Sequence, residues 1–366
     1  MGWRCGLVGL PNSGKSTLFN ALVGSGAEVA EYAFTTIDPN IGTVILADPR
    51  VEAIGHISRS EKITPTAIEV VDIAGLVKGA HTGEGLGNRF LSHVRSVDAI
   101  FHVVRCFTSI SVPHSMGRID PADDAGVVDL ELMLADLEVV ERRLEKTAKS
   151  FRAGEKVGTE FSALQKARTA LSKGVPARLA GLTYGESEAL APMALLTLKP
   201  CVYVCNVSEE HLHTPEQAPG FAGVVKYATI QAASVLALSC KIESELAELP
   251  PDEAEFFAQE LGLKSRGTGT LIKTGYEVLD LITFFTTNEN ETRAWTLERG
   301  LDAKEAAGKV HSQMARGFIK AEVTLADELI RLGSFAASRT AGATRIEGKD
   351  YVVKDGDVLL IRFSPS

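Results

Sequence analysis

The stretch Gly9-Leu10-Pro11-Asn12-Ser13-Gly14-Lys15-Ser16 decides the fold of this chain, because it satisfies the phosphate-binding pattern G-x-x-x-x-G-K-[ST]. An apolar run at residues 4–10 leads into it and predicts a buried strand, while Leu18, Phe19 and Leu22 follow at helical spacing. Glycines in such a loop let backbone N–H groups turn toward phosphate oxygens at the positive end of the helix. The order of strand, glycine-rich loop and helix therefore predicts a phosphate-binding loop (P-loop) at the start of an α/β domain.

Several residues of this loop are candidates for contact with a nucleoside triphosphate and its Mg²⁺. Lys15 can direct its charge toward the β- and γ-phosphates, which makes it a candidate for catalysis as well as binding. The Ser16 hydroxyl can occupy one position on Mg²⁺. The phosphate-binding residues predicted here are Asn12, Ser13, Gly14, Lys15, Ser16 and Thr17.

Two further elements follow in an order that indicates a nucleotide-dependent switch. Thr36 lies in a polar segment after the first predicted helix, where it can meet Mg²⁺ when a γ-phosphate is present. Asp72-Ile73-Ala74-Gly75 closes an apolar run, so that Asp72 can reach Mg²⁺ through water and Gly75 can offer its backbone N–H to the γ-phosphate. The predicted metal-binding residues are therefore Ser16, Thr36 and Asp72.

The pattern of apolar residues divides the chain into regions of different character. Short apolar runs bounded by polar or turn residues are typical of strands buried on both faces of a mostly parallel sheet. Such runs occur at 67–73, 99–104, 201–205 and 234–238. Between about 121 and 180 apolar residues recur instead at three- and four-residue steps, which predicts an antiparallel helical hairpin.

The last ~90 residues read as a separate unit built on a small mixed sheet. Residues 282–287 and 292–297 alternate around a polar turn and predict a β-hairpin, which a helix at 303–315 follows. Residues 349–353 and 358–363 predict a second hairpin. We therefore expect a nucleotide-binding domain over 1–275, interrupted by a helical insertion at 121–190, and a C-terminal domain over 276–366.

Composition limits the class of protein and its surroundings. The 366 residues are 45% hydrophobic and 23% charged, which is typical of globular proteins. The chain has no apolar run of the ~18 residues that a membrane helix needs, and its five scattered cysteines suit a reducing cytoplasm. The net charge is −9, yet residues 142–178 carry ten basic and three acidic side chains. This basic segment is either a solvated helical face or a surface for the phosphates of RNA.

At the family level the chain resembles the YchF, or Obg-like ATPase, family within the Obg group of P-loop GTPases. The matching segments run nearly end to end and are residues 9–17, 34–40, 72–80, 83–88, 206–209, 293–296 and 347–351. The resemblance implies a doubly wound P-loop domain with a mostly parallel sheet, an inserted helical coiled coil and a C-terminal TGS domain of ubiquitin-like β-grasp build. We expect a cytoplasmic monomer that makes no contact with membranes.

The segment after 201–205 bears on the choice of purine. GTPases of this class carry N/T-K-x-D there, and the Asp accepts two hydrogen bonds from guanine. Here the segment reads Asn206-Val207-Ser208-Glu209, which lacks the Lys and replaces the Asp with Glu, so guanine discrimination is lost. The resemblance implies ATP as the preferred nucleotide, with Asn206 and the Val207 backbone near the adenine. Ser239 begins the segment that stands where a loop usually backs the base.

Hydrolysis needs a group that orients water, and the usual one is absent. Leu76 stands where Ras-like enzymes carry Gln. The resemblance offers His114 as the catalytic residue, although a histidine in such a loop is often an ordinary surface residue. In related potassium-dependent P-loop proteins an Asn at the position of Asn12 holds K⁺ beside the phosphates, whereas a turn-forming role explains an Asn there equally well.

These features together predict an ATP-binding and ATP-hydrolysing molecular switch of the translation-factor class. The state with ATP and Mg²⁺ would order the segments of Thr36 and Gly75, and hydrolysis would release them. The expected partner is the ribosome or ribosomal RNA. Two alternatives stay open: a GTPase that acts in ribosome assembly, and a nucleotide-dependent binding module whose hydrolysis is vestigial.

Overall fold

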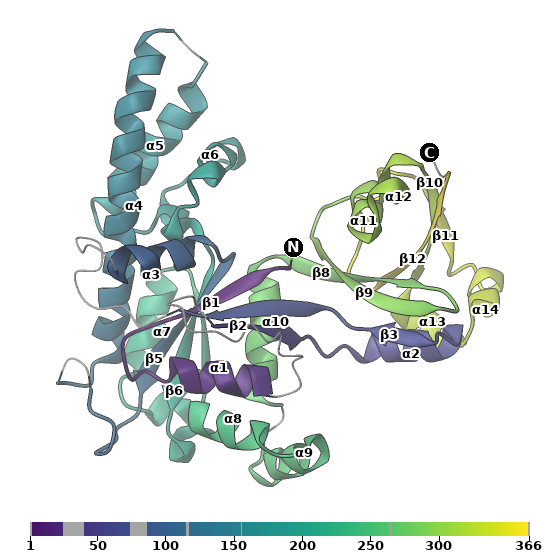
Figure 1. Cartoon of the computed structure of the whole chain (residues 1–366), viewed down its shortest axis with the longest axis horizontal. Helices are drawn as coiled ribbons and strands as arrows, with labels where there is room; N and C mark the ends of the chain where they lie inside the picture. Colours follow the sequence, from purple (N-terminus) through teal and green to yellow (C-terminus); the bar gives the residue numbers. More distant parts are fainter. Residues whose placement is uncertain are drawn as a thin grey trace. The chain divides into compact units, whose positions relative to one another are not determined.

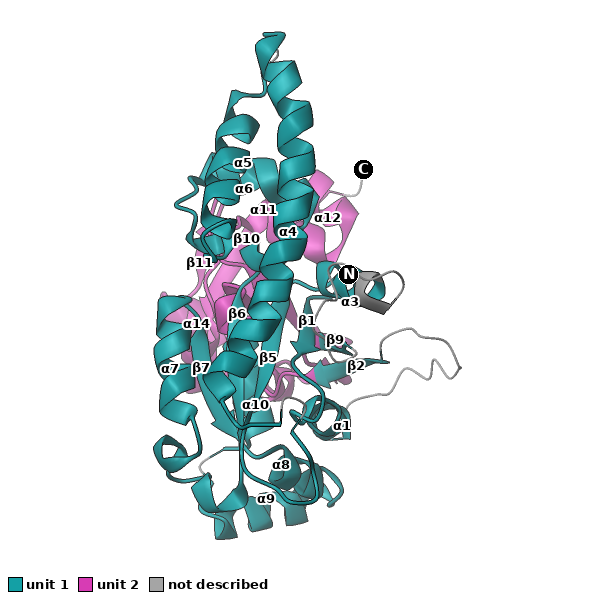
Figure 2. Cartoon of the chain, turned by 90° about the vertical axis from the view of Figure 1, so that its left-hand side faces the viewer, with its two compact units in different colours: residues 1–44, 69–275 teal, residues 45–68, 276–366 magenta. Residues whose placement is uncertain are grey.

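The computed structural model describes residues 2–24, 40–73, 86–114, 117–154, 156–263 and 265–364 (Figure 1). It divides into two compact units, of which unit 1 comprises residues 1–44 and 69–275, and unit 2 comprises residues 45–68 and 276–366 (Figure 2). The expected switch residues Thr36 and Gly75 lie outside the described residues.

Unit 1 is built on a six-stranded sheet in the order β2-β4-β1-β5-β6-β7. Its strands are β1 (Arg4–Val8), β2 (Asn40–Ile45), β4 (Ala67–Asp72), β5 (Ala99–Cys106), β6 (Cys201–Val207) and β7 (Ser234–Leu238). Strand β1 pairs in parallel with β4 and β5, and the parallel pairing continues through β6 to β7. Every residue of β5 and β6 is buried. The apolar runs predicted as strands of a mostly parallel sheet are thus confirmed as β1, β4, β5, β6 and β7.

Helices complete unit 1, and the first of them begins within the P-loop. The helices are α1 (Lys15–Gly24), α3 (Leu86–Arg95), α6 (Tyr184–Leu190), α7 (Phe221–Ile230), α8 (Cys240–Ala247), α9 (Pro251–Glu260) and α10 (Gly267–Val278). Parallel strands all end at the same edge of the sheet, so the segments that follow β1, β5, β6 and β7 come together there, beside Asp72 at the end of β4. That edge holds the candidate site.

The helical insertion consists of α4 (Pro121–Arg152) and α5 (Gly158–Leu171). The first half of α4 belongs to the core beneath the sheet through Ala125, Val128 and Leu132. Its second half packs on α5, where Val140 and Leu164 share a second core. Figure 2 shows this pair of helices extending beyond the sheet of unit 1, as the expected helical hairpin. None of the helices within the described ranges is both long and apolar enough to span a bilayer.

Unit 2 contains a second six-stranded sheet, in the order β11-β10-β12-β8-β9-β3. Its strands are β3 (Lys62–Thr64), β8 (Leu281–Thr287), β9 (Glu291–Glu298), β10 (Phe318–Leu325), β11 (Arg345–Glu347) and β12 (Asp357–Phe363). Its helices are α2 (Pro49–Ser58), α11 (Ala303–Val310), α12 (Ser312–Arg316), α13 (Ala326–Leu332) and α14 (Phe335–Thr340). The predicted hairpin of β8 and β9 is confirmed by their antiparallel register.

Two details of unit 2 differ from the sequence-based expectations. The helix expected over 303–315 is broken, because His311 has extended backbone angles (φ −163°) between α11 and α12. The hairpin expected from 349–353 and 358–363 is wrong. The Tyr351 carbonyl accepts from the N–H of Ala303 at 2.8 Å, so the earlier segment pairs with the start of α11, while β12 pairs with β10 and β8.

Residues 45–68 were expected in the nucleotide-binding domain. The structure groups them with unit 2 instead. Val51 and Ile54 of α2 share a core with Phe285. Strand β3 pairs in parallel with β9, and Arg50 bonds Asp355 at 2.8 Å. The segment between the expected switch residues therefore completes the sheet and core of the C-terminal unit.

Candidate functional site

A cavity of about 1170 Å³ opens at the strand-end edge of the unit 1 sheet. The carboxyl ends of parallel strands, where it lies, are the usual place for ligands in this class of fold. The predicted site residues that line it are Asn12, Gly14, Lys15, Ser16, Thr17, Asn206, Val207, Glu209 and Ser239. Ser13 and His114, in contrast, do not line it.

The P-loop backbone requires glycine at two positions. Gly9 and Gly14 have φ values of +150° and +106°, in the region that favours glycine. A Cβ on Gly9 would stand 2.4 Å from the carbonyl oxygen of Val103, so no other residue fits without displacing the backbone. Asn12 also has a positive φ of 64°, which Asn tolerates better than most residues. The predicted P-loop thus has the turn that directs backbone N–H groups toward a phosphate.

Lys15 lies beneath this turn with its side chain folded against the loop. Its Nζ donates to the carbonyl oxygens of Gly9 at 3.0 Å and Leu10 at 2.9 Å, and the residue is only 7% exposed. Burial lowers the pKa of the Lys15 ammonium to about 8, an effect that the charge of Asp72 partly opposes. A buried ammonium held by neutral carbonyls gains strongly from an arriving phosphate anion.

The two described residues of the predicted metal site are in direct contact. The Ser16 hydroxyl donates to Asp72 Oδ2 at 3.0 Å. Burial raises the pKa of the Asp72 carboxyl, while the bond from Ser16 and the charge of Lys15 lower it. A hydroxyl and a carboxylate are oxygen donors of the kind that Mg²⁺ prefers, so these residues fit that ion. Thr36, the third predicted ligand, is outside the described residues.

Asn206 connects the P-loop to the start of α8. Its Nδ2 donates to the carbonyl oxygen of Ser13 at 2.9 Å, and its Oδ1 accepts from the N–H of Cys240 at 3.0 Å. Ser239, the N-cap of α8, accepts from the N–H of Ile242. The buried amide of Asn206 therefore fixes the distance between the phosphate end of the cavity and the segment expected near the base.

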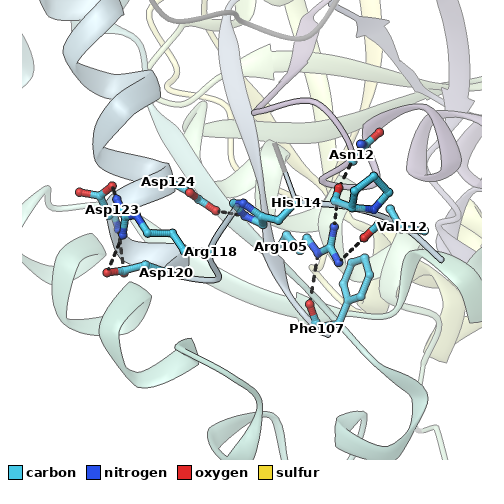
Figure 3. A network of polar contacts seen from close by, with 10 residues as sticks. Asn12, Arg105, Phe107, Val112, His114, Arg118, Asp120, Asp123 and Asp124 are labelled. Carbon is cyan, nitrogen blue, oxygen red and sulfur yellow. Dashed lines mark hydrogen bonds and ion pairs between the residues drawn. The ribbon is translucent and has the colours of Figure 1, made fainter. Parts of the chain in front are cut away.

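His114 does not line the cavity, and its side chain faces Asp124 of helix α4 (Figure 3). Its Nε2 is 2.7 Å from Asp124 Oδ2, and the two side chains are 8% and 6% exposed. The imidazole is thus hydrogen-bonded and mostly covered, while the residue as a whole is half-buried. Most of the residues between β5 and His114 do line the cavity, namely Phe107, Thr108, Ser109, Ser111 and Val112.

Comparison with known proteins places the chain in a family. The family model "50S ribosome-binding GTPase" matches residues 4–143, and YchF-GTPase_C, described as a protein of unknown function, matches residues 281–364. The "Ribosome-binding ATPase YchF" of Bacillus subtilis is 46% identical over 365 residues and covers 100% of both chains. This chain belongs to the YchF family. The YchF protein of Escherichia coli O157:H7 is 42% identical with the same coverage.

Solved structures agree with this membership. The structure of the fission-yeast (Schizosaccharomyces pombe) YchF GTPase is 33% identical, has a TM-score of 0.86, and is matched over 99% of this chain and 98% of that one. A GTP-binding protein of Pyrococcus horikoshii is matched over 99% of this chain and 100% of its own with a TM-score of 0.61, but at 18% identity it shows the fold alone. The P-loop fold expected from the sequence is thus confirmed.

Several cavity residues of this YchF chain were missed by the sequence analysis. Phe107 follows β5 directly, and its ring lies 4.4 Å from the buried guanidinium of Arg105. The other missed lining residues are Thr108, Ser109, Ser111, Val112, Ser208, Glu210, Cys240, Lys241, Ser244 and Glu245. Their position at the ends of β5, β6 and β7 was the available signal, since strand ends of one parallel sheet converge.

Proposed function

We propose that this YchF protein is an ATP-binding and ATP-hydrolysing molecular switch. The observation that carries the proposal is that Lys15 and Ser16 line one cavity and that the Ser16 hydroxyl is bonded to Asp72. Lys15 would pair with the β- and γ-phosphates, and Ser16, Asp72 and Thr36 would hold Mg²⁺. When bound, Mg²⁺ would neutralise charge on the phosphate oxygens.

The remaining assignments complete this switch. Gly75 would donate its N–H to the γ-phosphate, so that Thr36 and Gly75 respond to its presence. His114 would orient the attacking water. Asn12 would hold K⁺, and its Nδ2 already reaches the carbonyl oxygen of Pro113 at 3.2 Å, which links the P-loop to the segment that carries His114. The names of the bacterial relatives, which are called ATPases, support hydrolysis.

ATP is proposed as the nucleotide because the rim near the base lacks the guanine-binding pair. Glu209 and Glu210 are exposed there, and Lys241 is paired with Glu245 at 3.7 Å. An exposed carboxylate can accept a hydrogen bond from the amino group of adenine, whereas the Lys and the Asp that hold guanine in the N/T-K-x-D motif are both absent from residues 206–209. Asn206 and the Val207 backbone would lie beside the base.

Nucleotide affinity tests this choice. We expect the purified protein to bind ATP at least about tenfold more tightly than GTP, because the guanine edge lacks its hydrogen-bond partners. Isothermal titration calorimetry with both nucleotides measures the ratio. The double variant Val207→Lys/Glu209→Asp recreates the guanine motif and should gain affinity for GTP. Tighter binding of GTP by the wild type would support the GTPase alternative, since the fission-yeast relative is itself called a GTPase.

The proposed partner is the ribosome, through RNA phosphates contacted by the helical hairpin. Four of the ten basic residues in 142–178 are neutralised by ion pairs, namely Arg142, Arg143, Lys166 and Arg168. Across the described ranges, no carboxylate pairs with the exposed residues Lys146, Lys149, Arg152 and Lys156. These four residues, here called the tip cluster, surround the turn where the half-exposed ring of Phe151 stacks on Phe161.

Unpaired charge at the tip cluster predicts salt-sensitive RNA binding. The triple variant Lys146→Gln/Lys149→Gln/Arg152→Gln should lower ribosome co-sedimentation and reduce the slope of log K against log salt by about 2–3. The control Arg142→Gln/Arg168→Gln removes two charges that are already paired, and it should change the slope by less. Equal effects of the two variants, or no salt dependence in the wild type, would exclude the tip cluster as the RNA contact.

We further propose that the protein acts as a cytoplasmic monomer.

Single-turnover phosphate release separates an enzyme from a binding module with vestigial hydrolysis. An enzyme that uses His114 should hydrolyse ATP, with or without ribosomes, far faster than its His114→Ala variant. Negligible rates of both proteins in both conditions would favour the binding module.

A further inference from the structure

The hydrogen bond between His114 and Asp124 joins the segment after β5 to the first turn of α4. This bond turns the proposed catalytic imidazole toward Asp124 (Figure 3), and His114 does not line the nucleotide cavity. A histidine that orients water must lie within hydrogen-bond reach of that water, near the γ-phosphate. The described arrangement is therefore one that His114 must leave before it can act on the nucleotide.

Other hydrogen bonds hold the same segment in place. Arg105 donates from Nη2 to the carbonyl oxygen of Val112 at 2.8 Å and from Nη1 to that of Pro113 at 3.3 Å. Asn12 of the P-loop donates to the Pro113 carbonyl oxygen as well. The segment next to His114 is thus bonded both to the P-loop and to β5, so a change at the P-loop acts directly on the backbone beside His114.

If His114 moved away and nothing replaced it, the buried carboxylate of Asp124 would lose its hydrogen bond from the imidazole. Its Oδ1 has no hydrogen-bond partner within the described chain, and burial raises the pKa of its carboxyl, an effect that the bond to His114 opposes. Removing the hydrogen-bonded partner of a buried ionised group is strongly unfavourable. A cation that took the place of His114 beside Asp124 would remove this cost.

Two arginines act on the Asp124 carboxylate: Arg118, which is already paired with Asp120 and Asp123, and Arg105. Of the two, Arg105 is the buried one. The residue is 3% exposed and forms no ion pair with any carboxylate in the described parts of the chain, since its bonds go to the carbonyl oxygens of Phe107, Val112 and Pro113. Asp124 is the charged group that acts on its guanidinium, opposing the lowering of the Arg105 pKa by burial. A movement of residues 112–114 would break the bonds to the Val112 and Pro113 carbonyls and leave the guanidinium free to approach Asp124.

We propose that Asp124 is a positioning residue that keeps His114 out of the nucleotide cavity, and that His114 enters the cavity by exchanging places with Arg105 at Asp124. The inference rests on the proposed function, because it takes His114 as the group that orients water. Asp124 does not touch the nucleotide. It sets the fraction of molecules in which the imidazole is free to reach the site.

The test is the variant Asp124→Asn, which keeps the shape of the side chain and removes its charge. A hydrogen bond to a charged group is stronger than one to a neutral group, so His114 should be held less tightly by Asn than by Asp at position 124. The imidazole should then be free more often, and the ribosome-free single-turnover rate of ATP hydrolysis should rise roughly 10-fold to 100-fold. The affinity for ATP should not change. Asp123→Asn is the matched control, because Asp123 is the neighbouring carboxylate on α4 and its ion pair with Arg118 is half-exposed. Its rate should stay near that of the wild type.

The double variant Asp124→Asn/His114→Ala distinguishes this inference from the proposed function. It should lose the gain entirely, because the faster rate passes through His114. A rate that is unchanged or lower in Asp124→Asn, or a gain that persists in the double variant, would overturn the inference and leave a catalytic His114 intact. Hydrolysis by His114→Ala at the wild-type rate would instead refute the catalytic role itself.

A second measurement covers the case in which Asp124→Asn does not fold. Nitrogen NMR of histidine-labelled wild-type protein reports the hydrogen bond at His114 Nε2, and the His114→Ala spectrum assigns its signal. A non-hydrolysable ATP analogue with Mg²⁺ should shift that signal away from its nucleotide-free position. A signal that stays unchanged at saturating analogue would contradict the exchange of partners.

Discussion

Replacing Lys15 by methionine is expected to reduce the single-turnover rate of ATP hydrolysis by about 10²–10³-fold. Methionine keeps the apolar stem but removes the ammonium that would face the charge developing on the transferred phosphoryl group. The Lys15 ammonium is already buried and bonded to two loop carbonyls, so it needs little rearrangement to meet a triphosphate. Rapid-quench measurement with excess enzyme over ATP gives the rate directly.

Lys199→Met is the matched control for Lys15→Met. The Lys199 Nζ also donates to two backbone carbonyls, those of Arg95 at 2.9 Å and of Val97, and burial lowers the pKa of its ammonium too. It lies outside the cavity. Both variants lose an ammonium that is bonded to two backbone carbonyls, buried at Lys15 and half-buried at Lys199, and both should lose stability. Only Lys15→Met should lose hydrolysis. If the single-turnover rates of Lys15→Met and Lys199→Met were the same, the Lys15 ammonium would have a structural role alone.

The second large effect is expected from Gly14→Ala. An added Cβ would stand 2.3 Å from Asn206 Nδ2 and 3.2 Å from Cys240 Sγ, and the backbone there has φ +106°. Strain and overpacking together should lower the free energy of unfolding by about 3–5 kcal/mol. Because Asn206 also holds the Ser13 carbonyl and the Cys240 N–H, its displacement should weaken ATP binding by about 10²-fold.

Gly174→Ala separates backbone strain from the contact with Asn206. Gly174 has a φ of +70°, and a Cβ there meets nothing within 4 Å. This variant should lower the free energy of unfolding by only about 1–2 kcal/mol and leave ATP affinity unchanged. Chemical denaturation and calorimetric titration of both variants give the comparison. Equal losses of stability would mean that the contact with Asn206 contributes nothing.

Much of unit 1 could be predicted because its signals are local. Strands buried on both faces appear as continuous apolar runs, so β4 and β6 were visible without any knowledge of their neighbours. Strand β2 was missed because it lies at the edge of the sheet and has only two buried residues, which leaves no such run. The P-loop was predicted because its function fixes residue types at consecutive positions.

The candidate site was predictable only in part. The sequence indicated that Asn206 follows a strand near the base, but its bond to Ser13 joins residues 193 positions apart. The sequence likewise indicated His114 as a candidate, but not its hydrogen bond to Asp124 on α4. The basic residues of 142–178 can be counted in the sequence. Which of them are in ion pairs, and which are left unpaired in the tip cluster, depends on the carboxylates that the folded helices bring near. Hydrogen bonds and ion pairs between distant residues leave no periodic trace in a sequence.

By itself, the sequence determined the phosphate-binding loop, the positions of the buried strands along the chain, the helical insertion and the membership in the YchF family that the motifs indicated. These features depend on residue types at fixed short spacings. Tertiary structure alone decided that residues 45–68 complete the C-terminal unit, that Asn206 connects two loops, and that His114 is held by Asp124. In each of these cases the stabilising contact is with a group that only folding brings close, and the local pattern is compatible with several partners.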